Sequence, residues 1–238
     1  MFLKEELLNI QKLQPKELGP KHLVLSKIKY KKYWRKTSLK QKGIGDFFLN
    51  HVLERKPKNF LEVGVFHGVT SRNVCDLLNS IHGKDFKFTG IDLFLNKNEV
   101  DKEEFIPKTQ FSNPLKTFYY KYIIRLEPYS IVSVKKLLKK YEKNINIIKG
   151  NSNYVIKKIS LDEVDYVFLD GGHKYETVLN DLKSLKKVIE NNGVILCDDY
   201  DLTYAPGVKK AIDEYVLLNH FNLKILHSRF AEITKNST

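Results

Sequence analysis

Short apolar runs alternate with amphipathic stretches along the chain from residue 59 onward. Five runs have the length and apolar content of buried strands, namely 59–64, 86–93, 145–149, 164–170 and 193–198. Apolar residues recur at helical spacing in the stretches between and after them, namely 70–81, 131–141, 153–159, 175–189 and 207–218. Two more short strands, 223–226 and 230–234, are close enough to pair as an antiparallel hairpin.

This alternation predicts one Rossmann-like, doubly wound α/β domain over residues 51–238. Strands that are joined through helices run parallel, so we expect a mostly parallel seven-stranded sheet with the hairpin at one antiparallel edge. Sheets of this kind bind ligands at the carboxyl ends of their strands. Candidate binding and catalytic residues are therefore expected at the carboxyl ends of the strands.

Two regions stand outside the alternation. Residues 1–50 are predicted to form a basic, helical N-terminal extension. The segment 94–130 is longer than a usual strand-to-helix connection, and we interpret it as a lid over the ligand-binding edge. The alternative is a helix that only covers the sheet. Its middle part carries aromatic residues, namely Phe105, Phe111, Phe118, Tyr119, Tyr120 and Tyr122.

The composition fits a single core in a reducing compartment. With 238 residues, of which 42% are hydrophobic, the chain can build one large core rather than two full domains. No apolar run approaches the length of a membrane span, and early acidic residues argue against a secretory signal peptide. Cys75 and Cys197 lack metal-type spacing and cannot form a disulfide framework. We therefore expect a cytoplasmic protein.

The net charge of +13 raises the question of anionic partners. The cations are mainly lysine, and enrichment in lysine, asparagine and isoleucine is typical of AT-rich coding sequence. We favour that explanation over nucleic-acid binding, which stays open. Residues 21–42 are the exception, because they hold eight lysines, Arg35 and three aromatic residues but no acid. This stretch could contact phosphates, an acidic partner or a membrane surface, but we favour a solvated helical face whose aromatic residues pack on the body.

A turn containing two glycines follows the first predicted strand, between Glu62 and Gly68. Glycines at such a turn let the backbone approach a ligand, and the next helix presents free N–H groups. The G-x-x-x-G spacing differs from the G-x-G-x-x-G of dinucleotide-binding folds. The second strand ends at Asp92, where an acid can bind two ribose hydroxyls. The third ends at Gly150-Asn151-Ser152, where short polar side chains can contact an adenine edge.

Together these three strand ends resemble those of class I S-adenosylmethionine-dependent methyltransferases, and the resemblance covers residues 59–235. It implies S-adenosylmethionine as cofactor, with Asp92 at the ribose, Ser71 near the methionine carboxylate and Asn151 with Ser152 at the adenine. The full set of expected cofactor-binding residues is Glu62, Gly64, Gly68, Ser71, Asp92, Asn151, Ser152 and Asp170. The chain departs from the pattern at Asn151, where many relatives carry an aspartate. The alternative is a fold that kept the glycine turn for packing alone.

Acidic residues also follow the fourth and fifth predicted strands. The fourth ends in Asp170-Gly171-Gly172-His173 and the fifth in Asp198-Asp199. Adjacent parallel strands end side by side, so the three aspartates should converge, and three close carboxylates need a cation. Their hard oxygen atoms suit magnesium or calcium. A metal-bound hydroxyl loses its proton more readily, and histidine is the side chain best suited to accept a proton near neutral pH.

The sequence D-G-G-H-K-Y-E, followed by D-D-Y, resembles the macrocin-type metal-dependent sugar O-methyltransferases within the broad methyltransferase domain 24 family. This narrower resemblance implies that Asp170, Asp198 and Asp199 bind Mg²⁺. It also implies that His173 and Asp198 are catalytic, with His173 as the base. In the alternative interpretation Asp170 contacts only the cofactor, His173 caps the following helix, and Asp198-Asp199 form a polar turn.

The sequence thus favours an S-adenosylmethionine-dependent O-methyltransferase that acts on a hydroxyl of a sugar or another small metabolite. One alternative is a nucleic-acid methyltransferase, although no Asn/Asp-Pro-Pro-aromatic motif follows the fourth predicted strand. Another is a non-catalytic S-adenosylmethionine-binding protein that docks through its basic N-terminus. The identity of the acceptor and the oligomeric state stay open, with a homo-oligomer among the options.

Overall fold

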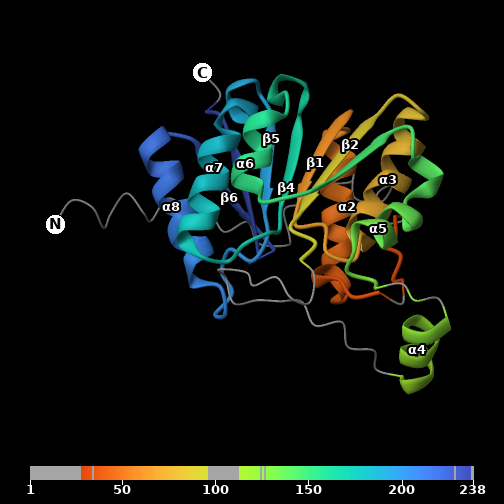
Figure 1. The fold of residues 1–238 in the computed structure, drawn as a ribbon. Helices are drawn as coiled ribbons and strands as arrows, with labels where there is room; N and C mark the ends of the chain where they lie inside the picture. Colours follow the sequence, from red (N-terminus) through yellow and green to blue (C-terminus); the bar gives the residue numbers. More distant parts are fainter. Residues whose placement is uncertain are drawn as a thin grey trace.

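A seven-stranded mixed sheet forms the centre of the computed structural model (Figure 1), which describes residues 28–33, 35–95, 113–123, 125, 127–227 and 229–236. The strands are β1 (Asn59–Val63), β2 (Lys87–Asp92), β3 (Ile145–Lys149), β4 (Tyr166–Leu169), β5 (Val194–Cys197), β6 (Asn222–Leu226) and β7 (Phe230–Thr234). Their order is β3-β2-β1-β4-β5-β7-β6. The first five run parallel, and β7 is antiparallel to both β5 and β6. The predicted Rossmann-like sheet with an antiparallel edge hairpin is confirmed.

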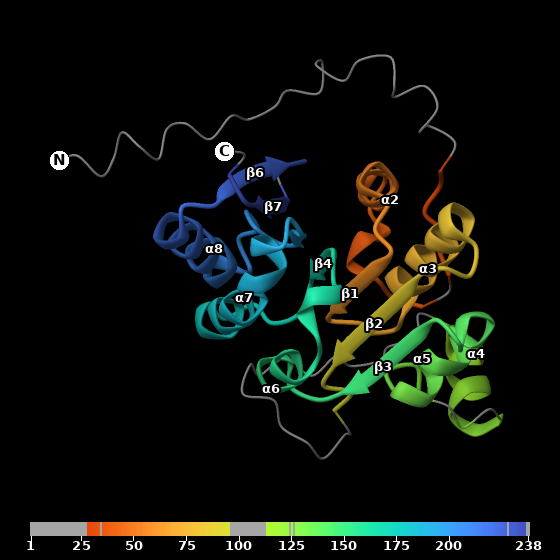
Figure 2. The same cartoon turned by 90° about the horizontal axis from the view of Figure 1, so that it is seen from above.

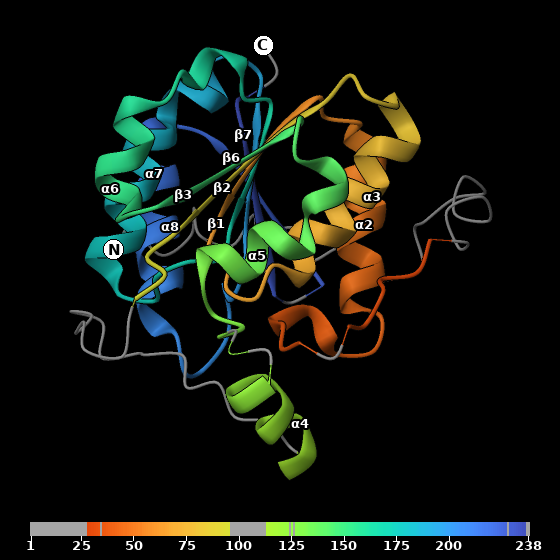
Figure 3. The ribbon, with the colours of Figure 1, turned by 45° about the vertical axis from the view of Figure 1, so that its right-hand side comes forward.

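Helices cover both faces of the sheet (Figures 2 and 3). One face carries α2 (Ile44–Arg55), α3 (Val69–His82) and α5 (Ile131–Leu137), and the other carries α6 (Ser152–Val155), α7 (Tyr175–Glu190) and α8 (Pro206–Asn219). The helix predicted over 131–141 divides into α5 and a 3-10 turn, Lys139–Tyr141. Proline suits the first turn of α8 because it has no N–H to leave unpaired. Among the described residues, no helix is long and apolar enough to cross a membrane.

The core has two halves, one on each face of the sheet. Successive strand residues point to opposite faces, so Phe60 joins the half under α2 and α3 while Leu61 joins the half under α7 and α8. In the first half the Phe60 ring stacks on Tyr166 at 4.9 Å and on Phe88 at 5.8 Å between ring centroids. Burial on both faces accounts for the nearly continuous apolar runs in the sequence.

The N-terminal segment 28–43 departs from the helix expected through residue 50. Its described residues contain only one short 3-10 turn, Ser38–Lys40, before α2 begins. The body satisfies several of its polar backbone groups. The Tyr30 N–H donates to Asp46, and the backbone of Lys31 exchanges two hydrogen bonds with the Asn73 side chain. These contacts replace intrahelical bonds, and α2 itself belongs to the body of the domain. Tyr30 is buried and Tyr33 is half-buried against the core; Trp34 lies outside the described residues.

Within the predicted lid segment 94–130 the structure describes residues 94–95, 113–123, 125 and 127–130, whereas Phe105 and Phe111 lie outside the described residues. The longest described part is α4 (Pro114–Phe118), which continues into a π-helical turn, Tyr119–Ile123. α4 projects from the body in Figures 1 and 3. Several of its large side chains are exposed, namely Leu115, Phe118, Tyr119, Tyr122 and Ile123.

A buried polar network ties α2 to the C-terminal hairpin. The Glu232 carboxylate accepts hydrogen bonds from His51 Nε2 and from Arg55, both at 2.6 Å. The other ring nitrogen of His51 lies 2.7 Å from the Tyr166 hydroxyl. Burial alone would raise the pKa of Glu232, but the His51 and Arg55 contacts outweigh it and lower that pKa to about 2. Glu232 therefore stabilises the fold in its ionised form.

Replacing Glu232 by glutamine should destabilise the protein by about 3 kcal/mol near neutral pH, because Arg55 loses its counter-charge and His51 loses a charged hydrogen-bond partner. The folded pKa lies below the unfolded value of about 4.3, so this contribution is complete above that value and is lost as pH falls toward about 2. Urea unfolding across this pH range measures the effect. Glu163→Gln, in an exposed pair with Lys87, is the matched control. An equal effect in both variants would contradict the role of the network.

Candidate active site

The glycine turn after β1 brings the ends of β1 and β4 together. Gly64 has a φ of +96°, and a Cβ on it would lie 1.9 Å from the Asp170 carbonyl oxygen. Gly68 has a φ of +73° and precedes the first turn of α3. Both positions need glycine, because a side chain would be strained at either and would clash with backbone at Gly64. The turn therefore lies directly against Asp170.

Two of the expected cofactor-binding acids lie at the ends of β1 and β2. Glu62 is buried and accepts a hydrogen bond from Ser71 Oγ; burial raises the pKa of its carboxyl to about 8, against the opposing effect of that bond. Asp92 accepts from the Phe66 N–H at 2.7 Å, the Phe94 N–H at 3.0 Å and the Tyr129 hydroxyl at 2.8 Å. Burial still raises the pKa of Asp92. Tyr129 was not among the predicted residues.

The third strand end lies beside Asp92. The Gly150 N–H donates to the Asp92 carbonyl at 2.9 Å, which places Asn151 and Ser152 at the same edge. The Asn151 side chain accepts from the Asn153 N–H at 3.0 Å and caps α6. The side-chain oxygen of Asn153 is buried and has no hydrogen-bond partner among the described residues. It is an acceptor that the sequence did not single out.

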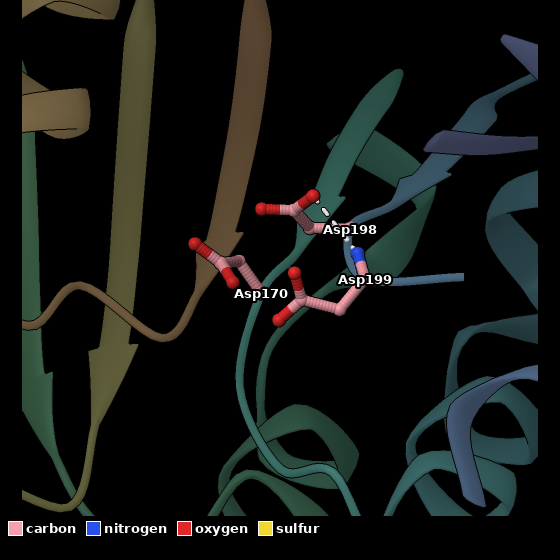
Figure 4. A group of neighbouring side chains, drawn as sticks. All are labelled: Asp170, Asp198 and Asp199. Atoms are coloured by element: carbon pink, nitrogen blue, oxygen red, sulfur yellow. Dashed lines mark hydrogen bonds between the residues drawn. The ribbon is translucent and has the colours of Figure 1, made fainter. Parts of the chain in front are cut away.

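The three predicted aspartates do converge. Asp170 follows β4, Asp198 and Asp199 follow β5, and one carboxylate oxygen from each lies within 4.8 Å of the other two (Figure 4). We call these residues the acid cluster. Burial, and then the charges of Asp198 and Asp199, raise the pKa of Asp170 well above its usual range. Among the described side chains, only Ser38 donates to its carboxylate in a resolved hydrogen bond, at 3.0 Å.

An arginine from the hairpin between β6 and β7 lies within the acid cluster. The Arg229 guanidinium contacts both oxygens of Asp198, with Nη2 at 2.6 Å from Oδ2, and lies 3.0 Å from Asp199. Burial alone would lower the pKa of Arg229, but these carboxylates outweigh it and raise that pKa. Arg229 offsets one of three negative charges, so two remain when all three aspartates are ionised. The sequence showed only that Arg229 is one of few arginines.

His173 and Tyr204 both contact Asp199. His173 Nε2 lies 2.9 Å from Asp199 Oδ2, and the Tyr204 hydroxyl donates to Oδ1 at 2.8 Å. A carboxylate only accepts, so Nε2 carries the proton and the lone pair of a neutral ring is on Nδ1. Burial would raise the pKa of Asp199, but His173, Tyr204 and Arg229 together lower it. A small recess opens here, lined by Leu169, Asp170, Gly171, Gly172, His173, Val178, Cys197, Asp198, Asp199 and Val208.

Comparison with known proteins identifies relatives of this chain. A family model described as "Methyltransferase domain" matches residues 61–200. Protein R132 of Acanthamoeba polyphaga mimivirus, described as uncharacterized, is 32% identical over 109 residues, which cover 40% of this chain and 49% of that protein. The chain therefore spans about half the length of this curated relative.

Solved structures with the same fold include three methyltransferases. CalS11, a calicheamicin methyltransferase also described as a TDP-rhamnose 3'-O-methyltransferase, superposes with a TM-score of 0.60 at 14% identity, covering 84% of this chain and 82% of its own. The O-methyltransferase NovP gives 0.59 at 17% identity, with 84% of each chain covered. The SAH-bound methyltransferase PaMTH1 of Podospora anserina gives 0.54 at 16% identity, covering 86% of this chain and 81% of its own. At these identities the likeness concerns the fold.

Replacing Arg229 by glutamine should destabilise the protein by about 3–5 kcal/mol near pH 8, because Asp198 and Asp199 stay buried without a counter-charge. Burial already raises the pKa of Asp198 although Arg229 opposes it, whereas the pKa of Asp199 is lowered. Without Arg229 the folded pKa of both carboxyls rises, so the loss of stability grows as pH rises from the unfolded value of about 3.9. Urea unfolding at about pH 5 and pH 8 tests this difference.

Arg72→Gln serves as the control, since Arg72 pairs with Asp76 on the outer side of α3. Its effect should be smaller and nearly constant over the same pH range. An Arg229→Gln variant as stable as the unmodified protein at about pH 8 would show that the guanidinium does not hold the acid cluster.

Proposed function

Because the chain belongs to the methyltransferase domain family, we propose that it transfers a methyl group from S-adenosylmethionine to a hydroxyl of a sugar or another small metabolite. One observation carries the proposal: an acid cluster with an adjacent histidine lies directly against the glycine turn. A methyl donor at the turn and a hydroxyl at the cluster would then be neighbours. The sugar acceptor draws support from CalS11, which is described as a TDP-rhamnose methyltransferase.

The residues at the strand ends fit S-adenosylmethionine. Asp92 has two carboxylate oxygens, and its three protein donors leave acceptor capacity for a ribose hydroxyl. The buried Asn153 oxygen matches the amino group of an adenine, which needs an acceptor. We assign the cofactor to the predicted set, namely Glu62, Gly64, Gly68, Ser71, Asp92, Asn151, Ser152 and Asp170, and add Asn153 to it.

The acid cluster fits a divalent cation. Its donors are hard carboxylate oxygens, and the charge left after Arg229 is that of two ionised carboxylates. Asp170 is the member with the fewest protein partners, whereas Asp199 already contacts three side chains. We therefore propose Asp170 as the principal ligand of Mg²⁺, joined by Asp198, which Arg229 contacts at both oxygens, and by Asp199, which also orients His173.

The proposed reaction gives a separate role to each of these groups. S-adenosylmethionine supplies an electrophilic methyl group, and a divalent cation makes a coordinated hydroxyl more acidic. Asp199 holds the Nε2–H of His173, which directs the basic Nδ1 of that ring to the proton of the acceptor. Tyr204 holds Asp199 from the other side. The contribution of this arrangement is to align the acceptor hydroxyl with the methyl group.

Replacing Asp170 by asparagine should weaken Mg²⁺ binding by at least about tenfold while leaving the metal-free protein as stable as before or more stable. Asp170 is half-buried beside two other carboxylates, which raise its pKa, so asparagine removes a group that is unfavourable to ionise without a cation. Isothermal titration measures Mg²⁺ affinity and thermal unfolding measures stability. Asp162→Asn, in an exposed pair with Lys187, is the matched control. Unchanged Mg²⁺ affinity in Asp170→Asn would remove the metal from the proposal.

Replacing His173 by alanine should slow methyl transfer by about 10²–10⁴-fold and leave cofactor affinity nearly unchanged, as expected for the loss of a general base. Transfer of labelled methyl groups to a panel of nucleotide sugars measures the rate, and titration with S-adenosylhomocysteine measures affinity. His82→Ala, remote from the acid cluster, is the control. Labelling of an oligonucleotide pool instead of sugars would favour the nucleic-acid alternative, and rapid transfer by His173→Ala would exclude the base role.

A further inference from the structure

We propose that Ser38 is a positioning residue of the acid cluster and that the neighbouring residues of segment 35–39 hold it there. Ser38 Oγ donates to Asp170 Oδ2 at 3.0 Å and lies 3.4 Å from Asp198 Oδ2. It thus bridges carboxylates that follow two adjacent strands. This inference rests on the proposed function, because it assigns Ser38 a role toward the cation at Asp170 and Asp198.

The segment is fixed on both sides of Ser38. Before it, the buried Arg35 guanidinium donates to the His67 carbonyl at 3.1 Å and to the Ser133 carbonyl at 3.3 Å. The Lys36 N–H donates to His67 Nδ1 at 3.1 Å. After it, the Leu39 side chain is fully buried in the core. A residue held between two such anchors keeps one position relative to the strand ends.

Thr37 adds a local constraint on the Ser38 backbone. Its side-chain oxygen accepts from the Leu39 N–H at 3.2 Å and caps the 3-10 turn that contains Ser38. The same oxygen lies 3.2 Å from the Tyr30 hydroxyl, which in turn lies 2.8 Å from Thr70 on α3. The fold of the segment therefore depends on Tyr30, Arg35, Thr37 and Leu39, and not on the Ser38 hydroxyl.

The Ser38 hydroxyl, by contrast, contacts only the acid cluster in the resolved hydrogen bonds of the described residues. It has one proton and donates it to Asp170, the nearer carboxylate. The Arg229 guanidinium contacts Asp198 and Asp199, so Ser38 is the resolved side-chain donor of Asp170 among the described residues. A donor on Oδ2 of this half-buried carboxyl restricts the orientation of the Asp170 side chain. Partners that orient a ligand in this way typically change metal affinity by about 10–100-fold when they are removed.

The test compares Ser38→Ala and Ser38→Thr with the unmodified full chain, using isothermal titration with Mg²⁺ alone and thermal unfolding without metal. Ser38→Ala should lose about tenfold in Mg²⁺ affinity, and Ser38→Thr, which keeps the hydroxyl, should recover most of it. The metal-free unfolding temperatures should stay close together, because the anchors of the segment are untouched. Ser184→Ala, an exposed serine that bonds to its own helix, is the matched control.

The outcomes separate this inference from the proposed function. If the unmodified chain binds Mg²⁺ and Ser38→Ala binds it equally well, the role of Ser38 is wrong and the metal site stands. If Ser38→Thr loses as much affinity as Ser38→Ala, a hydroxyl is not what the acid cluster needs, and the inference is again wrong. If the unmodified chain binds no Mg²⁺, the proposed metal role is wrong, and so is the proposed role of Ser38.

Discussion

The contact between Arg229 and the acid cluster is the constraint on which the site depends. Three carboxylates are brought together because β4 and β5 are adjacent and parallel, and burying such charges without a partner is costly. The guanidinium satisfies Asp198 with two parallel contacts and reaches Asp199 as well. Arg229 can do this because β7 pairs with β5, which places the turn before β7 at the end of β5. The edge hairpin therefore completes the site as well as the sheet.

The three aspartates of the acid cluster differ in how many hydrogen-bond donors contact them, and this difference gives them different roles. Asp199 accepts from His173, Tyr204 and Arg229, so its position is fixed and its pKa is low. Asp170 has Ser38 as its resolved side-chain donor, and its pKa is high. Because the Asp170 carboxyl is half-buried beside two others, its ionised form is unfavourable unless a cation binds it. Proteins retain such unfavourable groups at sites where ligand binding offsets the loss of stability.

The fold and the acid cluster could be predicted because both follow from local sequence patterns. Strands buried on both faces give continuous apolar runs, and the residue that ends each run lies at the ligand-binding edge, as Asp92, Asp170 and Asp198 do. Arg229 and Ser38 could not be found in this way, because they reach the site through long-range packing. Tyr204 lies five residues after Asp199, in a turn that carries no periodic pattern. Ser38 contacts Asp170 across a sequence separation of 132 residues, and no periodicity marks it. The expectation of a helix in segment 28–43 was wrong for the same reason, since the backbone groups of Tyr30, Lys31 and Lys36 bond to other elements.

Because of these long-range contacts, the site forms only when the whole domain is folded. Ser38 comes from the N-terminal segment and Arg229 from the C-terminal hairpin, yet both bond to Asp198 or lie within 3.4 Å of it. A ligand that binds at Asp170 and Asp198 therefore interacts with groups that are correctly placed only when both ends of the described chain have docked on the sheet. Binding to the folded state alone stabilises that state by mass action. Occupation of the site should consequently stabilise the N-terminal segment and the hairpin together, although they are far apart in sequence and share no direct pairing in the sheet.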